Sequence, residues 1–496
     1  MQKNHNRIFF VFVFFILVAY FLFRAIDQSQ MITSFPIDAY ANDYSSHLAR
    51  VFFLDKYGLY NIVPNWYNGA YTLLTFYTPL WYLSALPLYW ITKDIELAGY
   101  LSLIFLYILG FLFLYLFGRE AKLSKFKRIL FFLFFFVNPI AIGYFLRLGK
   151  LPEMFGWVWF FLIALLIFRY RERIIDKWFF LIVPFYVLIF YTHILVFIVA
   201  SLFLLMLFVY KNNFKERVFI IISVIFILAL TSFFWIPFLK NAQGNLAGTY
   251  FSLQWLISPG NITDKIVSFI IPITFWILFY FYWKSNGKLK KELVFFSVPL
   301  VFSFLYLTRI AVFIPLFNRP TPDSYHFFFI FFMSYMVLKM KVENLPSFLQ
   351  RYFYTILLVI VIIGVVISLI FTPLFQPHSE NIQETFSLLK EVDGKLILLK
   401  TPPEVFRGAV YSYGAIYYNI STPSGWEPIN ITKEYQQQLS LPSIYIEERN
   451  CGLLKESLVN LDTNNVITFN KYCNYLEECG FSLIDRKEHA CLYSLN

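Results

Sequence analysis

The sequence predicts an α-helical polytopic membrane protein with a small α/β domain at its C-terminal end. Of its 496 residues, 59% are hydrophobic and only 14% are charged, whereas soluble domains are less apolar and more highly charged. Apolar runs near the length that a bilayer demands recur from residue 8 to residue 372 and then stop. We therefore expect a transmembrane domain over residues 1–372 and an extracytoplasmic α/β domain over residues 373–496.

The net charge of +11 does not indicate a nucleic-acid partner, because Lys and Arg gather in short loops between the apolar runs. These basic loops cover residues 118–128, 169–177, 211–217, 284–291 and 339–351. The positive-inside rule makes them cytoplasmic. It places on the outer side a first loop of residues 24–94, a tight turn at Thr192 and His193, and everything after residue 373. The expected location is the cell membrane.

The apolar runs give the expected crossings in order. The first run, 8–23, follows Lys3 and Arg7 and lacks a small-residue cleavage site, so it should remain as the first span. The run 72–92 contains two prolines, and the alternation of loops works only if this run does not cross. The other runs are 95–117, 129–146, 152–168, 178–191, 193–210, 217–236, 264–283, 292–308, 324–338 and 352–372. The sequence thus predicts about 11 transmembrane helices, and about 13 at most if a helix is split or 72–92 crosses.

The C-terminal domain is predicted from short apolar segments. Residues 395–399, 443–446 and 490–493 are typical of strands, and residues 472–479 of a short helix. All four cysteines of the chain lie here: Cys451, Cys473, Cys479 and Cys491. In an oxidising compartment they would form up to two disulfides, in any of three pairings. Free thiols in a cytosolic tail are the alternative.

The most polar segment follows the first span. On a helix begun at Asn42 or Asp43, the side chains of Asp43, His47 and Arg50 fall at i, i+4 and i+7 and share one stripe. Such an amphipathic helix could lie at the membrane surface and turn this stripe toward water and a substrate. The alternative is that Asp43 is a helix cap and that His47 and Arg50 are solvated surface residues.

Further ionisable residues fall on the same outer side of the predicted topology. They are Asp38, Arg147, Lys150, Glu153, His193, Lys240, Arg309, Arg319, Asp323 and His326. The middles of the spans carry almost no charge, whereas an ion-coupled transporter usually has ionisable groups near the midplane. The pattern suits a site at the outer face, where carboxylates act as bases and cations hold a lipid phosphate. Individually, each residue could instead be an acid at a helix start, an interface anchor or an interfacial histidine.

Three stretches carry a resemblance to a known family. They are the acid, aromatic and His-x-x-Arg of residues 43–50, Asn65-Trp66-Tyr67-Asn68-Gly69 leading into residues 76–83, and Asn138-Pro139 before Arg147-x-Gly149 and Glu153. The first two resemble the GT-C membrane glycosyltransferases, more narrowly the membrane proteins labelled 6-pyruvoyl-tetrahydropterin synthase-related. The third is similar to the second outer loop of the oligosaccharyltransferase catalytic subunit. The resemblance implies a GT-C fold and transfer of a sugar from a polyprenyl-phosphate donor at the outer membrane face.

The resemblance also suggests roles for individual residues. Asp43 matches the catalytic acid-base group, with Asp38 as a less favoured substitute, and Glu153 matches the second-loop acid. With the helical spacing added, the expected catalytic residues are Asp43, Glu153 and His47, and the expected substrate-binding residues are Asp38, Arg50, Arg147, Lys150, His193 and Arg319.

The chain also departs from the family pattern. The second loop has no Asp-x-Asp pair and the tail no WWDYG-like run. No metal ligand is therefore assigned, a divalent metal stays an open alternative, and transfer to asparagine is not implied. The expected partners are a polyprenyl-phosphate sugar and a glycan, lipid or protein acceptor. The alternative function is a non-enzymatic lipid or polysaccharide transporter or a cell-envelope assembly factor.

Overall fold

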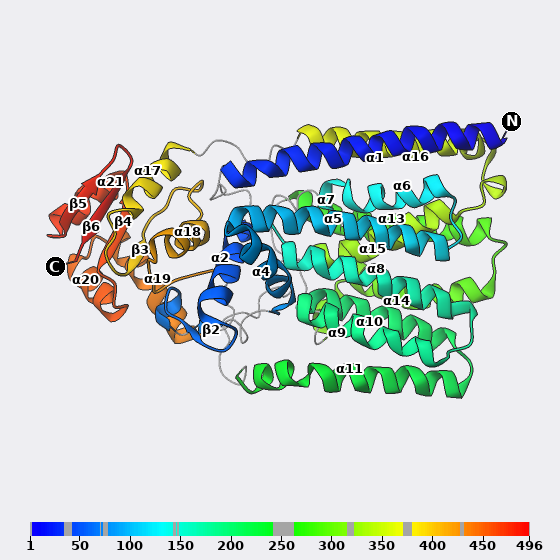
Figure 1. Ribbon diagram of the computed structural model, residues 1–496, viewed down its shortest axis with the longest axis horizontal. Coiled ribbons are helices and arrows are strands. Elements are labelled where there is room, and N and C mark those ends of the chain that lie inside the picture. Colours follow the sequence, from blue (N-terminus) through cyan, green and yellow to red (C-terminus); the bar gives the residue numbers. More distant parts are fainter. Residues whose placement is uncertain are drawn as a thin grey trace.

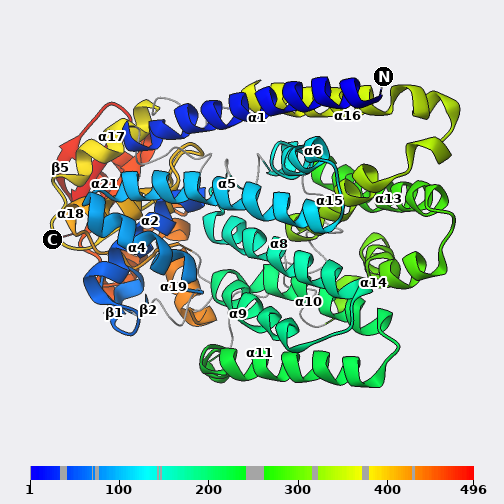
Figure 2. The same cartoon turned by 45° about the vertical axis from the view of Figure 1, so that its right-hand side comes forward.

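The computed structural model describes residues 2–33, 42–69, 71–72, 78–141, 145, 148–241, 262–314, 322–370, 379–426 and 431–495. Long helices run side by side, and the C-terminal domain lies at the end of the molecule far from the N-terminus (Figure 1). Between bundle and domain lie α2 (Asn42–Tyr57), α4 (Leu80–Thr92) and a two-stranded sheet of β1 (Ile62–Val63) and β2 (Tyr71–Thr72) (Figures 1 and 2). We call the bundle end beside these elements the domain-side end and the opposite end the distal end.

Each predicted apolar run that should cross overlaps a helix of the bundle. In chain order these are α1 (Gln2–Thr33), α5 (Ile95–Glu120), α6 (Lys125–Phe136), α8 (Leu151–Glu172), α9 (Ile182–Thr192), α10 (Ile194–Tyr210), α11 (Phe214–Asn241), α13 (Ile262–Ser285), α14 (Lys290–Leu307), α15 (Pro322–Lys339) and α16 (Ser347–Ile370). In the described part of the chain, five helices are long and apolar enough to cross a membrane, and three shorter apolar helices accompany them. The predicted class, a multi-pass helical membrane protein, is confirmed.

The first helix is longer than predicted. The sequence placed the start of the first loop at residue 24, but α1 continues to Thr33. Arg24 and Asp27 lie one turn apart, are buried, and form an ion pair of 3.3 Å. Arg24 also donates a hydrogen bond to Ser368 Oγ of the neighbouring α16 over 3.2 Å. Because these buried charges have partners, the helix continues through a segment where the charge pattern alone suggests an end.

The predicted run 129–146 does not form one continuous helix. α6 ends at Phe136 and is followed by the short α7 (Pro139–Ala141). The Asn138 amide donates to the carbonyls of Phe134 and Phe135 over 3.0 and 2.7 Å, and its oxygen accepts from the Ala141 N–H over 2.9 Å. Pro139 has no N–H to continue α6, so the Asn-Pro pair ends one helix and begins the next.

The helix in the run 72–92 is short. α4 has 13 residues, begins after Pro79 and contains Pro87. At 1.5 Å per residue it measures about 20 Å, well under the ~30 Å hydrocarbon core of a bilayer. It packs beside α2 at the domain-side end (Figures 1 and 2). α6 and α9 of the bundle have 12 and 11 residues and are shorter still, so helix length does not test the expectation that the run does not cross, which stays a prediction.

The core of the bundle surrounds α8 and is strongly aromatic. Phe160 and Phe161 of this helix are fully buried. Phe160 meets Phe203 of α10 edge to face with 4.8 Å between ring centroids, and Phe161 meets Phe135 of α6 in the same way at 4.9 Å. Such pairs add about 0.5–1.5 kcal/mol each to the free energy gained by burial. The packing fixes α8, and with it the first turn that carries Glu153.

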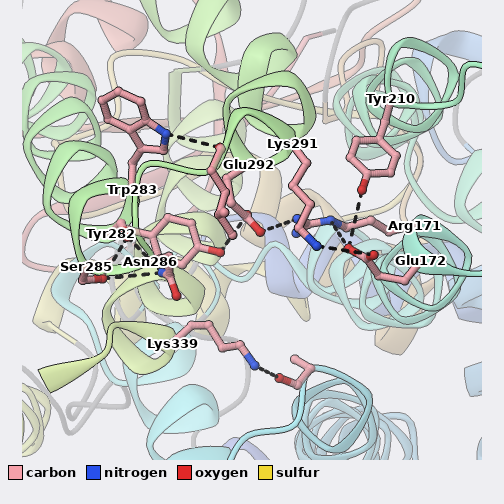
Figure 3. A network of polar contacts seen from close by, with 12 residues as sticks. Arg171, Glu172, Tyr210, Tyr282, Trp283, Ser285, Asn286, Lys291, Glu292 and Lys339 are labelled. Atoms are coloured by element: carbon pink, nitrogen blue, oxygen red, sulfur yellow. Dashed lines mark hydrogen bonds and ion pairs between the residues drawn. The ribbon is translucent and has the colours of Figure 1, made fainter. Parts of the chain in front are cut away.

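At the distal end, buried polar contacts tie several helices together (Figure 3). Arg171 near the end of α8 pairs with Glu292 at the start of α14, and the Tyr282 hydroxyl of α13 donates to the second oxygen of Glu292 over 2.9 Å. Lys339 at the end of α15 donates to the carbonyl of Ala121 over 2.6 Å. These contacts hold the distal ends of the helices in register.

The C-terminal domain is an α/β unit, as predicted. Its strands are β3 (Leu396–Leu398), β4 (Asn465–Phe469), β5 (Ser482–Arg486) and β6 (Ala490–Ser494), in the order β3-β4-β6-β5. β3 and β4 pair in parallel, and the other pairs are antiparallel. The helices are α17 (Glu380–Leu389), α18 (Arg407–Tyr418), α19 (Lys433–Glu447), α20 (Cys451–Asn460) and α21 (Lys471–Glu478).

One predicted strand of this domain is wrong. Residues 443–446 lie on α19, whereas 395–399 and 490–493 contain β3 and β6 and 472–479 overlaps α21. On α19, Pro442 and Ile446 are buried four residues apart while Ile444 is exposed, so the apolar spacing is that of a helix. The Thr432 side chain caps this helix by accepting from the Tyr435 N–H over 3.2 Å.

The cysteines are all paired. Cys451 bonds to Cys479 and Cys473 to Cys491. The first disulfide links the start of α20 to the end of α21, and the second links α21 to β6. The predicted disulfides are confirmed, the free-thiol alternative is wrong, and the pairing that four cysteines leave open is now specified.

Candidate functional site

The polar stripe predicted on α2 forms, but it does not face water. Asp43, His47 and Arg50 are 8%, 0% and 1% exposed. The helix packs against α18 of the C-terminal domain and against α4, so the stripe lies where the bundle meets that domain. The expectation of a water-facing stripe is therefore wrong, and so is the alternative of solvated surface residues.

Both carboxylate oxygens of Asp43 contact a donor. Lys150 Nζ lies 2.7 Å from Oδ2, and the Trp426 indole N–H donates to Oδ1 over 2.9 Å. The backbone N–H of Asp43 donates to the carbonyl of Leu148 over 3.1 Å. Three parts of the chain therefore meet at one carboxylate: α2, the loop before α8 and the C-terminal domain.

Gly149 allows the loop before α8 to come this close. Its φ is +69°, and a Cβ at this position would lie 2.8 Å from the backbone nitrogen and Cβ of Tyr44. A larger residue would be strained in this conformation and would also push the loop away from α2. The glycine thus brings the neighbouring Lys150 onto Asp43.

A tyrosine and a tryptophan surround the other two residues of the stripe. The Tyr82 hydroxyl lies 3.0 Å from His47 Nδ1 and accepts a hydrogen bond from Arg50 over 3.0 Å. The Arg50 guanidinium lies 4.5 Å from the Trp426 ring centroid, and the His47 ring meets the same indole edge to face at 4.9 Å. Cation–π and aromatic contacts of this kind hold both side chains in fixed orientations.

The histidines of the site are neutral at pH 7. Burial lowers the pKa of His47 well below its usual range, and repulsion from Arg50, Lys150 and His193 lowers it further. Burial, and then Lys150, lower the pKa of His193 to about 3. A neutral imidazole accepts a hydrogen bond at one ring nitrogen and donates one from the other, whereas a pKa this low makes it a poor proton acceptor at pH 7. The mutual electrostatic effects also show that Lys150 and the two histidines lie near one another.

A second acid and a histidine meet beside Lys150. Glu153, in the first turn of α8, is buried with Oε2 3.6 Å from His193 Nε2. His193 lies between α9 and α10, where the sequence predicted a tight turn. The Thr78 hydroxyl donates to the carbonyl of Thr192 over 2.8 Å and ties this turn to the segment before α4.

The structure brings most of the described site predictions into one cluster. Its members are Asp43, His47, Arg50, Lys150, Glu153 and His193. Asp38, Arg147 and Arg319 lie outside the described residues, and only the backbone is described for Lys240 and Asp323. Arg309 and His326 belong to another polar group, in which Arg309 donates to Ser268 Oγ over 2.7 Å and His326 Nε2 lies 3.1 Å from the Tyr306 hydroxyl.

Two contacting residues were not predicted. Tyr82 lay in the stretch 76–83 that carries the resemblance to the GT-C glycosyltransferases but was assigned no role, and Trp426 lay in the tail, 383 residues from Asp43. No spacing rule connects residues so far apart. The Gly425-Trp426 dipeptide also resembles the membrane proteins labelled 6-pyruvoyl-tetrahydropterin synthase-related, but this resemblance assigns no role to Trp426.

The residues around Asp43 do not fit a divalent metal. An ammonium group and an indole N–H contact its two oxygens, and both are donors that occupy the positions where a cation would bind. Elsewhere in the described ranges, Glu384, Glu488 and His489 have ligand atoms near one another. Glu384 accepts there from the backbone N–H groups of His489 and Ala490 over 2.8 and 2.9 Å, so its role is explained by the fold.

Known structures share this architecture. No family model matches the sequence, and no curated protein matches it. The crystal structure of ArnT from Cupriavidus metallidurans in the apo state has a TM-score of 0.55 and 9% identity, covering 100% of this chain and 98% of that one. The same protein bound to undecaprenyl phosphate has a TM-score of 0.56 and 10% identity, covering 96% and 97%.

A third solved structure has a similar fold. The Archaeoglobus fulgidus oligosaccharyltransferase, tethered with an acceptor peptide containing the NVT sequon, has a TM-score of 0.55 and 9% identity, covering 91% of this chain and 69% of that one. At such low identity the likeness concerns the fold. These neighbours and the helical bundle with its small C-terminal sheet show that the chain has the GT-C fold of membrane glycosyltransferases.

Proposed function

We propose that this chain is an integral membrane glycosyltransferase that moves a sugar from a polyprenyl-phosphate-linked donor to an acceptor at the outer membrane face. One observation carries the proposal: on a GT-C fold, the Asp43 carboxylate and the Lys150 ammonium meet at 2.7 Å beside the Glu153 and His193 pair. A base for the acceptor and a cation for the leaving phosphate are the groups that such a transfer requires.

The reaction follows from the chemistry of these groups. Asp43 removes the proton from an acceptor hydroxyl while the hydroxyl oxygen bonds to the anomeric carbon of the donor sugar. The bond between that carbon and the phosphate oxygen breaks, and its electron pair leaves with the lipid phosphate. Lys150 is 23% exposed at its side chain, the most accessible group in contact with Asp43, so it can turn to this phosphate and leave Asp43 free to accept the proton.

The remaining residues have supporting roles in the proposal. Glu153, whose Oε2 lies 3.6 Å from Nε2 of neutral His193, is a second carboxylate beside Lys150, and neutral His47, held by Tyr82, orients the stripe. Asp38 remains a proposed substitute for Asp43. Arg50 would add positive charge near the phosphate, as would Arg147 and Arg319.

The location of the substrates also belongs to the proposal. One neighbour binds undecaprenyl phosphate and another holds an acceptor peptide, which supports a lipid-linked donor and a separate acceptor. An extracytoplasmic C-terminal domain, and hence an outer-face site, is supported by its two disulfides and by the basic loops. The narrower kinship with the membrane proteins labelled 6-pyruvoyl-tetrahydropterin synthase-related rests on the sequence motifs.

The first test is mass spectrometry of the purified protein for a bound polyprenyl-phosphate sugar. The second is transfer from undecaprenyl-phosphate hexoses to acceptors of the native membrane in proteoliposomes. Asp43→Asn keeps the shape and the hydrogen bond from Trp426 but removes the base, so kcat should fall on the order of 10²–10⁴-fold while undecaprenyl phosphate still binds. Asp38→Asn should be milder.

Asp55→Asn is the matched control, because Asp55 lies on the same helix but is exposed and bonded to Trp90. It should leave transfer unchanged. Near-normal transfer by Asp43→Asn would contradict the assignment and point to Glu153 or Asp38. Lipid movement across the membrane by a wild-type protein that transfers no sugar would favour the transporter alternative.

A further inference from the structure

The first loop and the C-terminal domain are joined by paired backbone. The N–H of Tyr67 donates to the carbonyl of Ser424 over 3.0 Å, and the N–H of Thr422 donates to the carbonyl of Asn65 over 2.9 Å. The N–H of Asn68 reaches the carbonyl of Thr422 over 3.4 Å. We call these two segments, residues 65–68 and 422–424, the seam. Backbone pairing of this kind fixes the second segment in register with the first.

The seam holds an unusual backbone. Tyr67 and Asn68 both have φ of 53°, and Gly69 follows with φ of 81°. Residues other than glycine rarely adopt this left-handed backbone conformation, and two such residues in succession keep it only where surrounding contacts require it. Here the conformation turns the N–H groups of residues 67 and 68 toward the carbonyls of Ser424 and Thr422. The strained backbone thus allows the hydrogen bonds that join the first loop to the C-terminal domain.

Gly425 continues the seam toward Asp43. A Cβ at this position would lie 2.8 Å from the ring of Tyr67 and 3.2 Å from Trp66 Cγ. Both aromatic side chains are buried and cannot easily move aside. Only glycine lets the chain pass this close, and the next residue, Trp426, is thereby brought over α2.

Trp426 is held more firmly than the other partner of Asp43. It is 6% exposed, with its ring packed against Arg50 and His47, whereas the Lys150 side chain is 23% exposed at the end of a flexible stem. The indole N–H is a neutral donor that cannot take the proton. The oxygen it contacts, Oδ1, is therefore occupied throughout, and Oδ2 becomes available once Lys150 turns away.

We propose that Trp426 is a positioning residue of the transfer reaction: the seam carries it from the C-terminal domain onto α2, where its N–H fixes the Asp43 carboxylate so that Oδ2 takes the acceptor proton. This inference rests on the proposed role of Asp43 as the base. It makes the C-terminal domain a part of the reaction site, through one hydrogen bond and one aromatic ring.

The central test distinguishes the role of the Trp426 indole N–H from the role of its aromatic ring. Trp426→Phe keeps an aromatic ring between Arg50 and His47 but removes the donor to a charged group, so kcat for transfer from undecaprenyl-phosphate hexose should fall about 10- to 100-fold. The KM for this donor should stay the same, because the indole N–H acts through the Asp43 carboxylate. Trp90→Phe is the matched control, since the Trp90 indole also donates to an aspartate, Asp55, over 2.7 Å but at an exposed position. It should leave kcat unchanged.

The seam itself is tested with a pair of glycines. Gly425→Ala should lower kcat about as much as Trp426→Phe, because the new methyl group must displace the Tyr67 ring or move Trp426. Gly452→Ala in the same domain is the control, since its nearest neighbour, Asn450 Oδ1, lies 3.7 Å from the added Cβ. A Gly425→Ala protein with the wild-type kcat would contradict the role of the seam.

The failure of this inference can be told apart from failure of the proposed function. Full transfer by Asp43→Asn refutes the base assignment. If Asp43→Asn is inactive but Trp426→Phe has the wild-type kcat, or raises KM with kcat unchanged, the positioning role alone is refuted. In a protein with residual Asp43→Asn activity, adding Trp426→Phe should cause no further loss. If Trp426→Phe unfolds at a lower temperature than the wild type, benzothienyl-alanine at position 426 replaces it, because this residue keeps the bicyclic shape without the N–H; normal kcat would then refute the inference.

Discussion

The buried ion pair at the distal end gives a quantitative prediction. Arg171 and Glu292 are both largely buried, and Glu292 has a second contact, the hydrogen bond of 2.9 Å from Tyr282. In Arg171→Met the Glu292 carboxylate would stay in the core and keep the hydrogen bond from Tyr282, but it would lose the cation that balances its charge. Leaving one charge of a buried pair uncompensated costs about 3–5 kcal/mol. The unfolding equilibrium constant should therefore rise on the order of 10²–10³-fold or more.

The measurement is unfolding of the purified protein in detergent, followed by tryptophan fluorescence. Arg171→Met combined with Glu292→Gln should regain much of the loss, because glutamine still accepts from Tyr282 and carries no charge. Arg173→Met is the control: Arg173 is exposed, its contact with Glu120 is 3.8 Å long, and its removal should change the free energy of unfolding by about 1 kcal/mol or less. The reasoning is refuted if Arg171→Met matches this control, or if the double variant is less stable than the single one.

Three further predictions concern topology, disulfides and pH. Reporter fusions at Ser124 and after Phe375 should give opposite signals, cytoplasmic and extracytoplasmic, and equal signals would refute the proposed outer-face site. Replacing Cys451 and Cys479 together by Ser should lower the free energy of unfolding by about 3 kcal/mol, since the disulfide closes a separation of 28 residues; reduction of the wild type, which breaks both disulfides, should lower it further, and an unchanged denaturant midpoint of the variant would contradict the prediction. The protein should lose stability as pH falls below about 6.5, where unfolded His193 gains a proton that the folded imidazole, with its pKa of about 3, does not take up. His193 should account for a loss of about 1.4 kcal/mol of unfolding free energy per pH unit, and His193→Gln should lack this contribution. Equal slopes of unfolding free energy against pH in the wild type and the variant would show that His193 is not responsible.

Local rules predicted most of the fold from the sequence. The length of the apolar runs predicted the bundle helices, because a helix that crosses a bilayer needs a long apolar stretch. The basic loops marked where these helices end. The rules failed where tertiary contacts override them. Arg24 and Asp27 did not end α1, because they pair with each other inside the protein. Residues 443–446 alternate like a strand but lie on α19, where Pro442 and Ile446 are buried four residues apart on one helical face.

The site was partly predictable for a similar reason. Asp43, His47 and Arg50 share a stripe set by helical spacing, and Glu153 follows a proline that starts a helix, so sequence alone singles them out. What faces the stripe depends on contacts between distant segments. Burial of the stripe under Trp426 arises from the seam, and no periodicity in the chain encodes it.

The distance in sequence between Asp43 and Trp426 has a consequence for biosynthesis. The two residues are 383 positions apart, which at about 5–20 residues per second means that roughly 20–80 s of translation separate them. During that interval the membrane helices can insert while the Asp43 carboxylate still lacks its indole partner. An aborted chain that ends before residue 426 therefore cannot carry the complete group around Asp43. The group around Asp43 is completed only once the segment that carries Trp426 has been synthesised and has folded back onto α2.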